Sequence, residues 1–308
     1  MGKDLIIGVV DNYTWEQIKY WANSIDKSGY TGHKALFVYN MDAATAKKLT
    51  DEKFTIIGAS KFDEEKGFTY EHKGGSIMVD RFVHLYQVLE NLDRSSEVRN
   101  VIATDVRDVI FQGDPSKWLD ENITTKERLI VGSENMQYIN EPWNAQNMVL
   151  AFGDLFFNKM MNKEIYCAGV IAGSFDTFKD FCLNLWLICR GLNPHVEGGG
   201  GPDQSAMNIM LHMDAYKDKV KLVSPKEGWV CHAGTTMGAI QAGSGAIGEA
   251  YKRDPTLDFR SKFVDSIEYL IHTSDEKIYV GDTLVTILHQ WDRVPKWKEM
   301  VESKYGDN

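Results

Sequence analysis

The stretch VIATDVRDVIFQGDP places two acidic residues, Asp105 and Asp108, directly after a short apolar run. Carboxylates at positions i and i+3 can face the same way from a tight turn, and their oxygens suit a hard divalent cation that also takes phosphate oxygens. A structural interpretation is also available, in which Asp105 closes an Asx turn and Asp108 pairs with Arg107 at the surface. The motif alone leaves both interpretations open.

Three further segments contain residues suited to ligand binding. In DNYTWEQ, Tyr13 could stack on a base, although taken alone it is more simply a half-buried turn aromatic. In EGGGGPDQSAMN, four glycines precede Asp203 and Gln204 at a helix start, where backbone can approach an anionic or hydroxyl-rich ligand. A flexible connection with Asp203 as the N-cap explains that pattern equally well. His289 follows an apolar run near the C-terminus, and a lone histidine is more often structural.

Apolar periodicity in the first half predicts alternating strands and helices. The expected strands are 5–10, 35–39, 54–57 and 101–104, and the expected helices begin at Thr14, at Ala43 and after Gly74-Gly75. The third helix should bury Met78, Phe82, Leu85 and Leu89. Such alternation indicates a mostly parallel sheet covered on both faces. Ligands bind beyond the carboxyl ends of parallel strands, where residues 11–13 and 105–108 both lie.

The second half is less regular. It predicts strands at 129–132, 167–172 and 221–224, a helix capped by Ser174, and another helix near Asp203. No linker or internal repeat interrupts the chain. We therefore expect one domain over 1–308, with a nucleotide-binding half at 1–130 and a sugar- and acceptor-binding half at 131–308.

Composition limits the partners. The chain has 308 residues, 43% of them hydrophobic, and a net charge of -10, so nucleic acid and anionic membranes gain no electrostatic attraction. The four cysteines lack CxxC spacing, which favours buried free thiols in a reducing compartment. No apolar run is long enough to span a bilayer, and the N-terminus resembles a strand rather than a signal peptide. We expect a soluble, cytoplasmic protein.

In their order along the chain, these segments resemble the GT-A fold glycosyltransferases, most closely the retaining, family 8-like enzymes of the glycogenin and galactinol synthase kind. The matching motifs are the Asp-Asn-Tyr turn, the acidic motif, the glycine-containing strand YCAGVIAGS, the Asp-Gln helix start and the late histidine. The resemblance implies a Rossmann-like α/β fold in a single domain, with a mostly parallel central sheet flanked by helices. It also implies transfer of a sugar from a nucleotide-diphosphate sugar, with UDP-sugar favoured, and retention of configuration.

The same resemblance implies a metal site. In that family an acidic motif and a C-terminal histidine hold Mn²⁺ or Mg²⁺ at the donor diphosphate, which here corresponds to Asp105, Asp108 and His289. This chain departs from the usual D-x-D by reading D-x-x-D. The departure leaves Asp105 to contact the ribose or a water while Asp108 binds the metal directly, and Arg107 would limit repulsion between the acids.

The remaining candidates divide between the donor and the acceptor. The nucleotide-binding candidates are Asp11, Asn12, Tyr13, Lys73, Arg81 and Asp105. Asp203 and Gln204 are the catalytic candidates, expected to bond sugar hydroxyls or to stabilise an oxocarbenium-like state. Aromatic and polar residues in SENMQYINEPW and GWVCHAGTTMG suggest sugar contacts; the sugar- and acceptor-binding candidates are Gly169, Trp143, Trp229 and His232. The acceptor would be a hydroxyl of a glycan, a protein or a small molecule, and the acidic charge disfavours nucleic acid.

Two other classes compete with this interpretation. A non-catalytic module of the same fold could bind a sugar nucleotide or a glycan, but it would not need Asp105, Asp108 and His289 together. A haloacid dehalogenase-like phosphatase also places two acids after a strand. That class has a D-x-D-x-T/V pattern after its first strand, and the segment Asp11-Asn12-Tyr13-Thr14 lacks the second acid.

Overall fold

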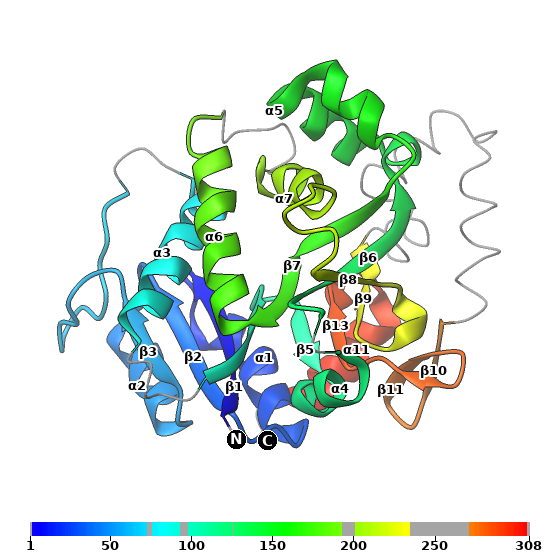
Figure 1. Cartoon of the computed structure of the whole chain (residues 1–308). Coiled ribbons are helices and arrows are strands. Elements are labelled where there is room, and N and C mark those ends of the chain that lie inside the picture. The colour runs from blue at the N-terminus through cyan, green and yellow to red at the C-terminus, as the bar shows by residue number, and fades with distance from the viewer. Residues whose placement is uncertain are drawn as a thin grey trace.

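A seven-stranded sheet runs through the centre of the molecule (Figure 1). The computed structural model describes residues 2–72, 76–92, 98–124, 126–192, 201–234 and 271–306. In spatial order the strands are β3 (Thr55–Gly58), β2 (His33–Val38), β1 (Lys3–Val10), β4 (Val98–Thr104), β7 (Glu164–Ser174), β6 (Leu129–Gln137) and β8 (Val220–Val223).

Pairing within this sheet is mostly parallel. Strands β3, β2, β1 and β4 are mutually parallel, β7 is antiparallel to both β4 and β6, and β8 is parallel to β6. This confirms the predicted α/β class. The chain leaves β1 toward β2 and β3 and then returns to place β4 on the other side of β1. The order therefore reverses between β1 and β4, and such a reversal opens a crevice at the carboxyl ends of the two strands.

Helices cover both faces of the sheet. They are α1 (Trp15–Lys27), α2 (Ala43–Asp51), α3 (Ile77–Asn91), α4 (Pro115–Asn122), α5 (Pro142–Met160), α6 (Phe175–Cys189), α7 (Asp203–Leu211) and α11 (Pro295–Tyr305). Alternate residues of β1 enter two different cores: Ile6 packs with Trp21 of α1, and Ile7 packs with Phe82 of α3 and Phe178 of α6. Figure 1 shows α3 and α6 side by side over one face. A strand buried on both faces explains the continuous apolar sequence of β1.

One predicted core residue is wrong. Met78 is 42% exposed, and Val79 takes the buried position at the start of α3. Helix α3 begins at Ile77, and its buried residues Val79, Phe82, Leu85 and Leu89 form one stripe at helical spacing. Met78 lies one residue, about 100°, off that stripe.

Strands β6 and β7 extend beyond the predicted runs because their antiparallel ladder continues past the apolar residues. Strand β6 contains buried polar residues, Ser133 and Glu134, after the apolar run ends. It also crosses the expected boundary at residue 130, and β4 pairs with β7 in one sheet, so strands from both expected halves are neighbours. The division into two functional halves stays a prediction.

A second, small sheet brings together segments that are distant along the chain. Strand β13 (Ile287–His289) lies between β5 (Val109–Phe111), to which it is antiparallel, and β9 (Val230–His232), to which it is parallel. A third sheet contains β10 (Ile271–Ser274), β11 (Lys277–Val280) and β12 (Thr283–Leu284). The small β5–β13–β9 sheet positions the C-terminal histidine of the candidate site.

Other sequence expectations concern cysteines and membranes. Cys167, Cys182, Cys189 and Cys231 are all buried free thiols. Within the described ranges, no helix is both long enough and apolar enough to cross a membrane.

Candidate metal and nucleotide site

The acidic turn is held in place by backbone bonds on two sides. The Asp105 amide donates to the Gly169 carbonyl of β7 at 2.8 Å, which extends the β4–β7 pairing by one residue. The Gln290 amide, just after β13, donates to the Asp108 carbonyl at 2.6 Å. His289 in β13 pairs with Val109 in β5, the residue directly after Asp108, and this pairing places the His289 ring beside the acidic turn. The fold thus brings the acidic turn, Gly169 and His289 together, although they are far apart in sequence.

Asp105, Asp108 and His289 form one cluster. His289 Nε2 lies 3.6 Å from Asp105 Oδ2 and 3.8 Å from Asp108 Oδ1, and one ligand atom from each residue lies within 4.8 Å of the others. Two carboxylates and an imidazole fit a divalent cation such as Mn²⁺, since carboxylate oxygens suit Mg²⁺ and Mn²⁺ and imidazole suits transition metals. The donor set therefore matches the expected metal, and three protein ligands would leave further coordination positions for phosphate oxygens.

Gly169 allows β7 to pass close to this cluster. A Cβ atom at this position would lie only 2.9 Å from both Asp105 Oδ2 and His289 Nε2, closer than real Cβ contacts. Glycine is thus required by the close approach of the strand to the cluster. A sugar contact for Gly169 stays a prediction.

Arg81 of α3 supplies the charge that compensates the acids. Its Nη1 lies 2.7 Å from Asp105 Oδ1, and its Nη2 lies 3.0 Å from Asp203 Oδ2. Arg107, expected to separate the acids, is half exposed, and its Nη2 lies 3.9 Å from Asp108 Oδ2. Arg81 makes the close contact instead, because α3 packs against the sheet while Arg107 points toward solvent.

The two acids differ in their electrostatics. Burial alone would raise the pKa of Asp105, but the Arg81 guanidinium and His289 outweigh it and lower that pKa to about 2. Burial raises the pKa of Asp108, and the nearby His289 does not offset it. Burial would lower the pKa of His289, but Asp105 and Asp108 raise it. Asp105 is therefore the more readily ionised carboxylate, and protons would compete with a metal at His289 and at Asp108.

Asp203 and Gln204 begin α7 beside this cluster. Asp203 is buried and bonded to Arg81, and burial raises its pKa. Gln204 accepts from the Ala168 amide at 3.1 Å, and its Nε2 donates to Glu134 Oε1 at 3.1 Å and to Asn144 Oδ1 at 2.8 Å. Sequence reasoning missed this network. The sequence signal that could have indicated it is the acidic residue Glu134 in the SENMQ segment, shortly after the apolar run 129–132.

The first turn after β1 lies at the same edge of the sheet. Asn12 has a left-handed backbone with φ 57°, and its amide donates to the Asn40 carbonyl at 2.9 Å. Asp11 Oδ1 accepts from Asn40 Nδ2 at 2.6 Å. Burial raises the pKa of Tyr13, and the charges of Arg107, Asp105 and Asp108 also act on its hydroxyl.

Some predicted residues cannot be placed at the site. Lys73 and Gly74-Gly75 lie outside the described residues, as do the first glycines of the loop before α7. Trp229 is fully buried, and its ring packs on Trp118 with centroids 4.8 Å apart, which makes it a core residue rather than part of an acceptor surface. Trp143 is half-buried in the first turn of α5.

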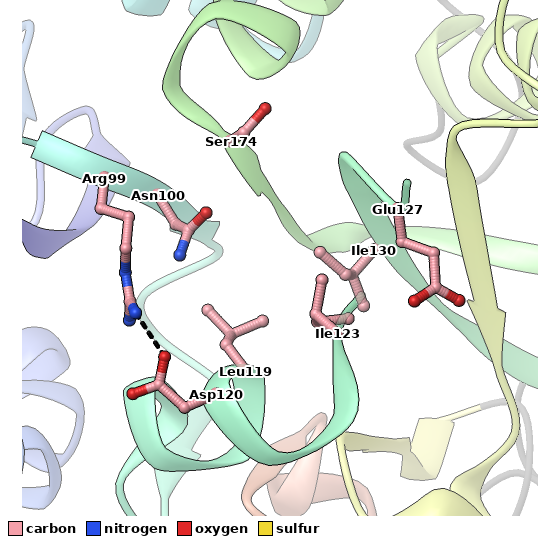
Figure 2. Close-up of a pocket in the computed structure, with 8 residues that line it drawn as sticks. All are labelled: Arg99, Asn100, Leu119, Asp120, Ile123, Glu127, Ile130 and Ser174. Atoms are coloured by element: carbon pink, nitrogen blue, oxygen red, sulfur yellow. Dashed lines mark hydrogen bonds and ion pairs between the residues drawn. The ribbon is translucent and has the colours of Figure 1, made fainter. Parts of the chain in front are cut away.

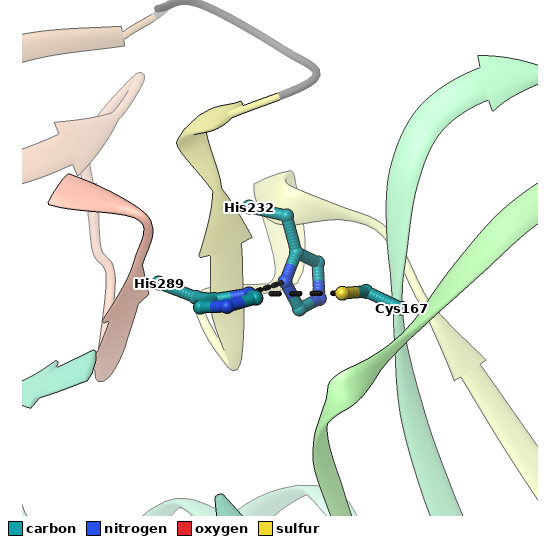
Figure 3. A group of neighbouring side chains, drawn as sticks. All are labelled: Cys167, His232 and His289. Atoms are coloured by element: carbon teal, nitrogen blue, oxygen red, sulfur yellow. Dashed lines mark hydrogen bonds between the residues drawn. The ribbon is translucent and has the colours of Figure 1, made fainter. Parts of the chain in front are cut away.

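His232, also expected at the acceptor, lies buried behind His289. Figure 3 shows Cys167 of β7, His232 of β9 and His289 of β13 directed toward one another. The two Nδ1 atoms lie 2.8 Å apart, and Cys167 Sγ lies 3.6 Å from His289 Nδ1. Burial holds the pKa of His232 well below its usual range. His289 therefore has the carboxylates on its Nε2 side and His232 with Cys167 on its Nδ1 side.

A pocket of about 160 Å³ lies elsewhere (Figure 2). It is lined by Arg99, Asn100, Leu119, Asp120, Ile123, Glu127, Ile130 and Ser174. Arg99 and Asn100 belong to the first half of β4, whereas the acidic turn follows the last residue of that strand. The pocket is thus at the opposite edge of the sheet from the candidate site and contains none of the predicted site residues.

Comparison with solved structures identifies the fold. The bifunctional glycosyltransferase WbbM in its apo form is similar to this chain with a TM-score of 0.54 and 11% identity, over 97% of this chain and 50% of that one. The fold is of the GT-A glycosyltransferase type. The glycosyltransferase GlyE of Streptococcus pneumoniae TIGR4 is similar with a TM-score of 0.46 and 12% identity, over 98% of this chain and 63% of that one. The chain thus spans less than two thirds of either protein. No family model and no curated protein matches the sequence.

Proposed function

We propose that the chain is a metal-dependent glycosyltransferase that moves a sugar from a nucleotide-diphosphate sugar to a hydroxyl acceptor. The observation that carries the proposal is the meeting of Asp105, Asp108 and His289 at the carboxyl end of β4, beside the switch point of a glycosyltransferase fold. A structural role alone would not require three ligand-type side chains from two distant segments to converge there.

In this proposal Asp105, Asp108 and His289 hold Mn²⁺ or Mg²⁺. The bound cation would act as a Lewis acid that offsets negative charge on the departing diphosphate. Arg81 keeps Asp105 ionised and anchors Asp203, so its charge stabilises the ligand set rather than the diphosphate directly. Since the whole chain carries a net charge of -10, a local cation is what allows an anionic donor to bind.

The donor would extend from the metal toward the first turn. Asp11 and Tyr13 follow β1, the strand next to β4, and are assigned to the ribose and the base. An aromatic face such as that of Tyr13 can stack on a base. The resemblance to family 8-like enzymes favours a UDP-sugar. Lys73 is a further candidate for the donor phosphates.

The sugar would lie toward α7. Asp203 is linked to Asp105 through the shared Arg81, and Gln204 joins Glu134 and Asn144 in one hydrogen-bonded group. Amide and carboxylate groups arranged in this way can bond sugar hydroxyls and stabilise positive charge at the anomeric carbon. We assign retention of configuration from the family resemblance. The acceptor is a hydroxyl of a glycan, a protein or a small molecule.

Nucleotide binding tests the proposal most directly. Thermal unfolding is measured with UDP, GDP, CDP and dTDP, each with and without Mn²⁺, on wild type, Asp108→Asn and Asp120→Asn. A ligand at a hundred times its Kd adds roughly 2.7 kcal/mol of stability, which raises Tm by a few degrees. Asp120→Asn is the matched control because it removes the same charge at the opposite edge of the sheet, where Asp120 pairs with Arg99.

We expect one nucleotide, UDP, to raise the Tm of wild type and Asp120→Asn only when Mn²⁺ is present. Asp108→Asn should lose that shift. If no nucleotide raises the Tm of wild type in the presence of Mn²⁺, the proposal fails. If the shift persists unchanged in Asp108→Asn, the metal site is wrongly assigned. The anomeric configuration of the product, read by NMR with the sugar donor, then decides between retention and inversion.

A further inference from the structure

We propose that His232 is a positioning residue that fixes the tautomer of His289, so that the lone pair of His289 Nε2 points at the site between Asp105 and Asp108. This inference rests on the proposed metal-dependent function. It assigns to His232 a role behind the site, in place of the acceptor contact expected from sequence.

The geometry around the His289 ring carries the argument. Its Nε2 lies 3.6 Å from Asp105 Oδ2 and 3.8 Å from Asp108 Oδ1. Its Nδ1, on the other side of the ring, lies 2.8 Å from His232 Nδ1 (Figure 3). A separation of 2.8 Å is a hydrogen-bond distance. Two lone pairs or two hydrogens cannot face each other at this distance, so one hydrogen lies between the nitrogens. A neutral imidazole has one donor and one acceptor nitrogen, so the position of this hydrogen decides the role of both rings.

The proposed metal site on the other side of His289 indicates which ring carries the hydrogen. A cation between Asp105 and Asp108 needs the lone pair of His289 Nε2, so the hydrogen of a neutral His289 must be on Nδ1. His232 Nδ1, 2.8 Å away, is then the acceptor of that hydrogen, and the hydrogen of a neutral His232 is on Nε2. The shared hydrogen then resides on His289 Nδ1, and His289 Nε2 has a lone pair for a metal. Metal-bound histidines usually donate their other N–H to such a partner.

A second arrangement uses the same three side chains, in which Cys167, His232 and His289 together hold a soft metal. Zinc bound tetrahedrally at its usual bond lengths keeps two nitrogen ligands about 3.3 Å apart. The observed separation of 2.8 Å is shorter than this and matches a hydrogen bond. We therefore assign the contact between the two rings to a hydrogen and not to a metal, and Cys167 Sγ makes a second, longer contact of 3.6 Å to the same His289 Nδ1.

The test measures Mn²⁺ affinity by titration followed with EPR of the free ion. The proteins are wild type, His232→Leu, His232→Asn, Cys167→Ala and Asp108→Asn, each checked for its Tm without metal. Leucine removes the acceptor, whereas the asparagine amide oxygen can take the place of Nδ1. Losing such a partner typically weakens metal affinity by about 10–100-fold. We expect that loss in His232→Leu, recovery of most of it in His232→Asn, and affinity close to wild type in Cys167→Ala.

A second readout reports the tautomer directly and does not depend on the leucine variant. In the Mg²⁺-saturated wild type, imidazole ¹⁵N shifts should show His289 protonated at Nδ1 and His232 protonated at Nε2. The opposite assignment overturns the inference.

The outcomes separate the inference from the proposed function. If wild type binds Mn²⁺, Asp108→Asn does not, and His232→Leu binds as wild type does, the inference is wrong and the metal site stands. If Cys167→Ala loses affinity as strongly as His232→Leu, a metal lies on the Cys167 side and the inference is overturned. If wild type itself does not bind Mn²⁺, both the site and the inference fall.

Discussion

At the scale of single residues, Arg81 determines the charge state of the site. It bonds Asp105 and Asp203 at once, and it keeps the pKa of Asp105 at about 2 against the effect of burial. Asp108 lacks such a close cation, and burial raises its pKa. The site thus combines one carboxylate that is always ionised near neutral pH with one that titrates more easily.

The Arg81→Met variant tests this role through the pH dependence of Mn²⁺ binding. A metal binds ionised carboxylates, so affinity falls as pH drops through the pKa of each ligand that must lose a proton. In wild type Asp105 stays ionised down to about pH 2, so His289 and Asp108, whose pKa values are both raised, account for the loss. Without Arg81, burial raises the pKa of Asp105, so Asp105 joins His289 and Asp108 in taking up a proton, and affinity should fall more steeply with decreasing pH than in wild type.

Arg107→Met is the matched control, because Arg107 is also an arginine near the acids but is half exposed and 3.9 Å from Asp108. We expect its pH profile to follow wild type. Removing Arg81 from its buried ion pairs costs about 3–5 kcal/mol, so both variants are titrated well below the Tm of Arg81→Met. Identical profiles for Arg81→Met and wild type would show that Arg81 does not control Asp105.

At the scale of elements, the site depends on how closely two sheets approach. Strand β7 of the central sheet and β13 of the small sheet meet at Gly169 and His289, with no room for a Cβ atom between them. The acidic turn is bonded to both, through the Gly169 carbonyl and the Gln290 amide. A change that separates β7 from β13 therefore moves the proposed metal ligands apart.

Gly169→Ala should reduce Mn²⁺ affinity by roughly tenfold or more, because the added methyl group displaces His289 or Asp105, and small shifts in ligand geometry are costly. Gly113→Ala serves as the control. Its Cβ would meet its nearest neighbour, Leu284 Cδ2, at 3.6 Å, an ordinary contact. Isothermal titration of both variants with Mn²⁺ checks this. Equal Mn²⁺ affinity in Gly169→Ala and Gly113→Ala would mean that the close approach of β7 to His289 does not determine the geometry of the site.

At the scale of the whole molecule, the C-terminal segment connects the site to the core. Helix α11 packs on α1, where Asn23 Nδ2 donates to the Tyr305 carbonyl at 2.9 Å. Trp297, Val301 and Tyr305 belong to the same buried cluster as Leu288 of β13. The packing of α11 thus holds the segment that contains His289 against the rest of the fold.

Tyr305→Ala should lower the free energy of unfolding by roughly 3 kcal/mol, since truncating a buried aromatic side chain leaves a cavity. Tyr305 is 2% exposed. Mn²⁺ affinity measured well below the Tm should stay near the wild-type value, because the substitution removes no ligand. Urea unfolding and the Mn²⁺ titration check both parts, with Lys298→Ala on the solvent side of α11 as the control. A large loss of affinity with little loss of stability would contradict this account.

Much of the fold could be predicted because the first half alternates between apolar strands and amphipathic helices. Periodicity located β1, α1 and the stripe of α3 to within a few residues, and it failed at Met78 because a neighbouring residue of similar hydrophobicity took the buried position. In the less regular second half, β6 extends past its apolar run through Ser133 and Glu134. Local hydrophobicity does not show that β6 pairs with β7, so the extension of β6 was not predictable from it. The hydrogen bonds of Gln204 join segments distant in sequence and were not predictable from it either.

For the site, the sequence by itself determined which groups could bind a cation: two acids after a strand and a late histidine. Residue types and strand ends are local properties. Only the tertiary structure decided that β13 pairs with β5 and β9, that Arg81 rather than Arg107 compensates Asp105, and that His232 stands behind His289. These contacts join segments far apart in the chain. Their partners are selected by packing and strand pairing across the whole molecule, which no local pattern encodes.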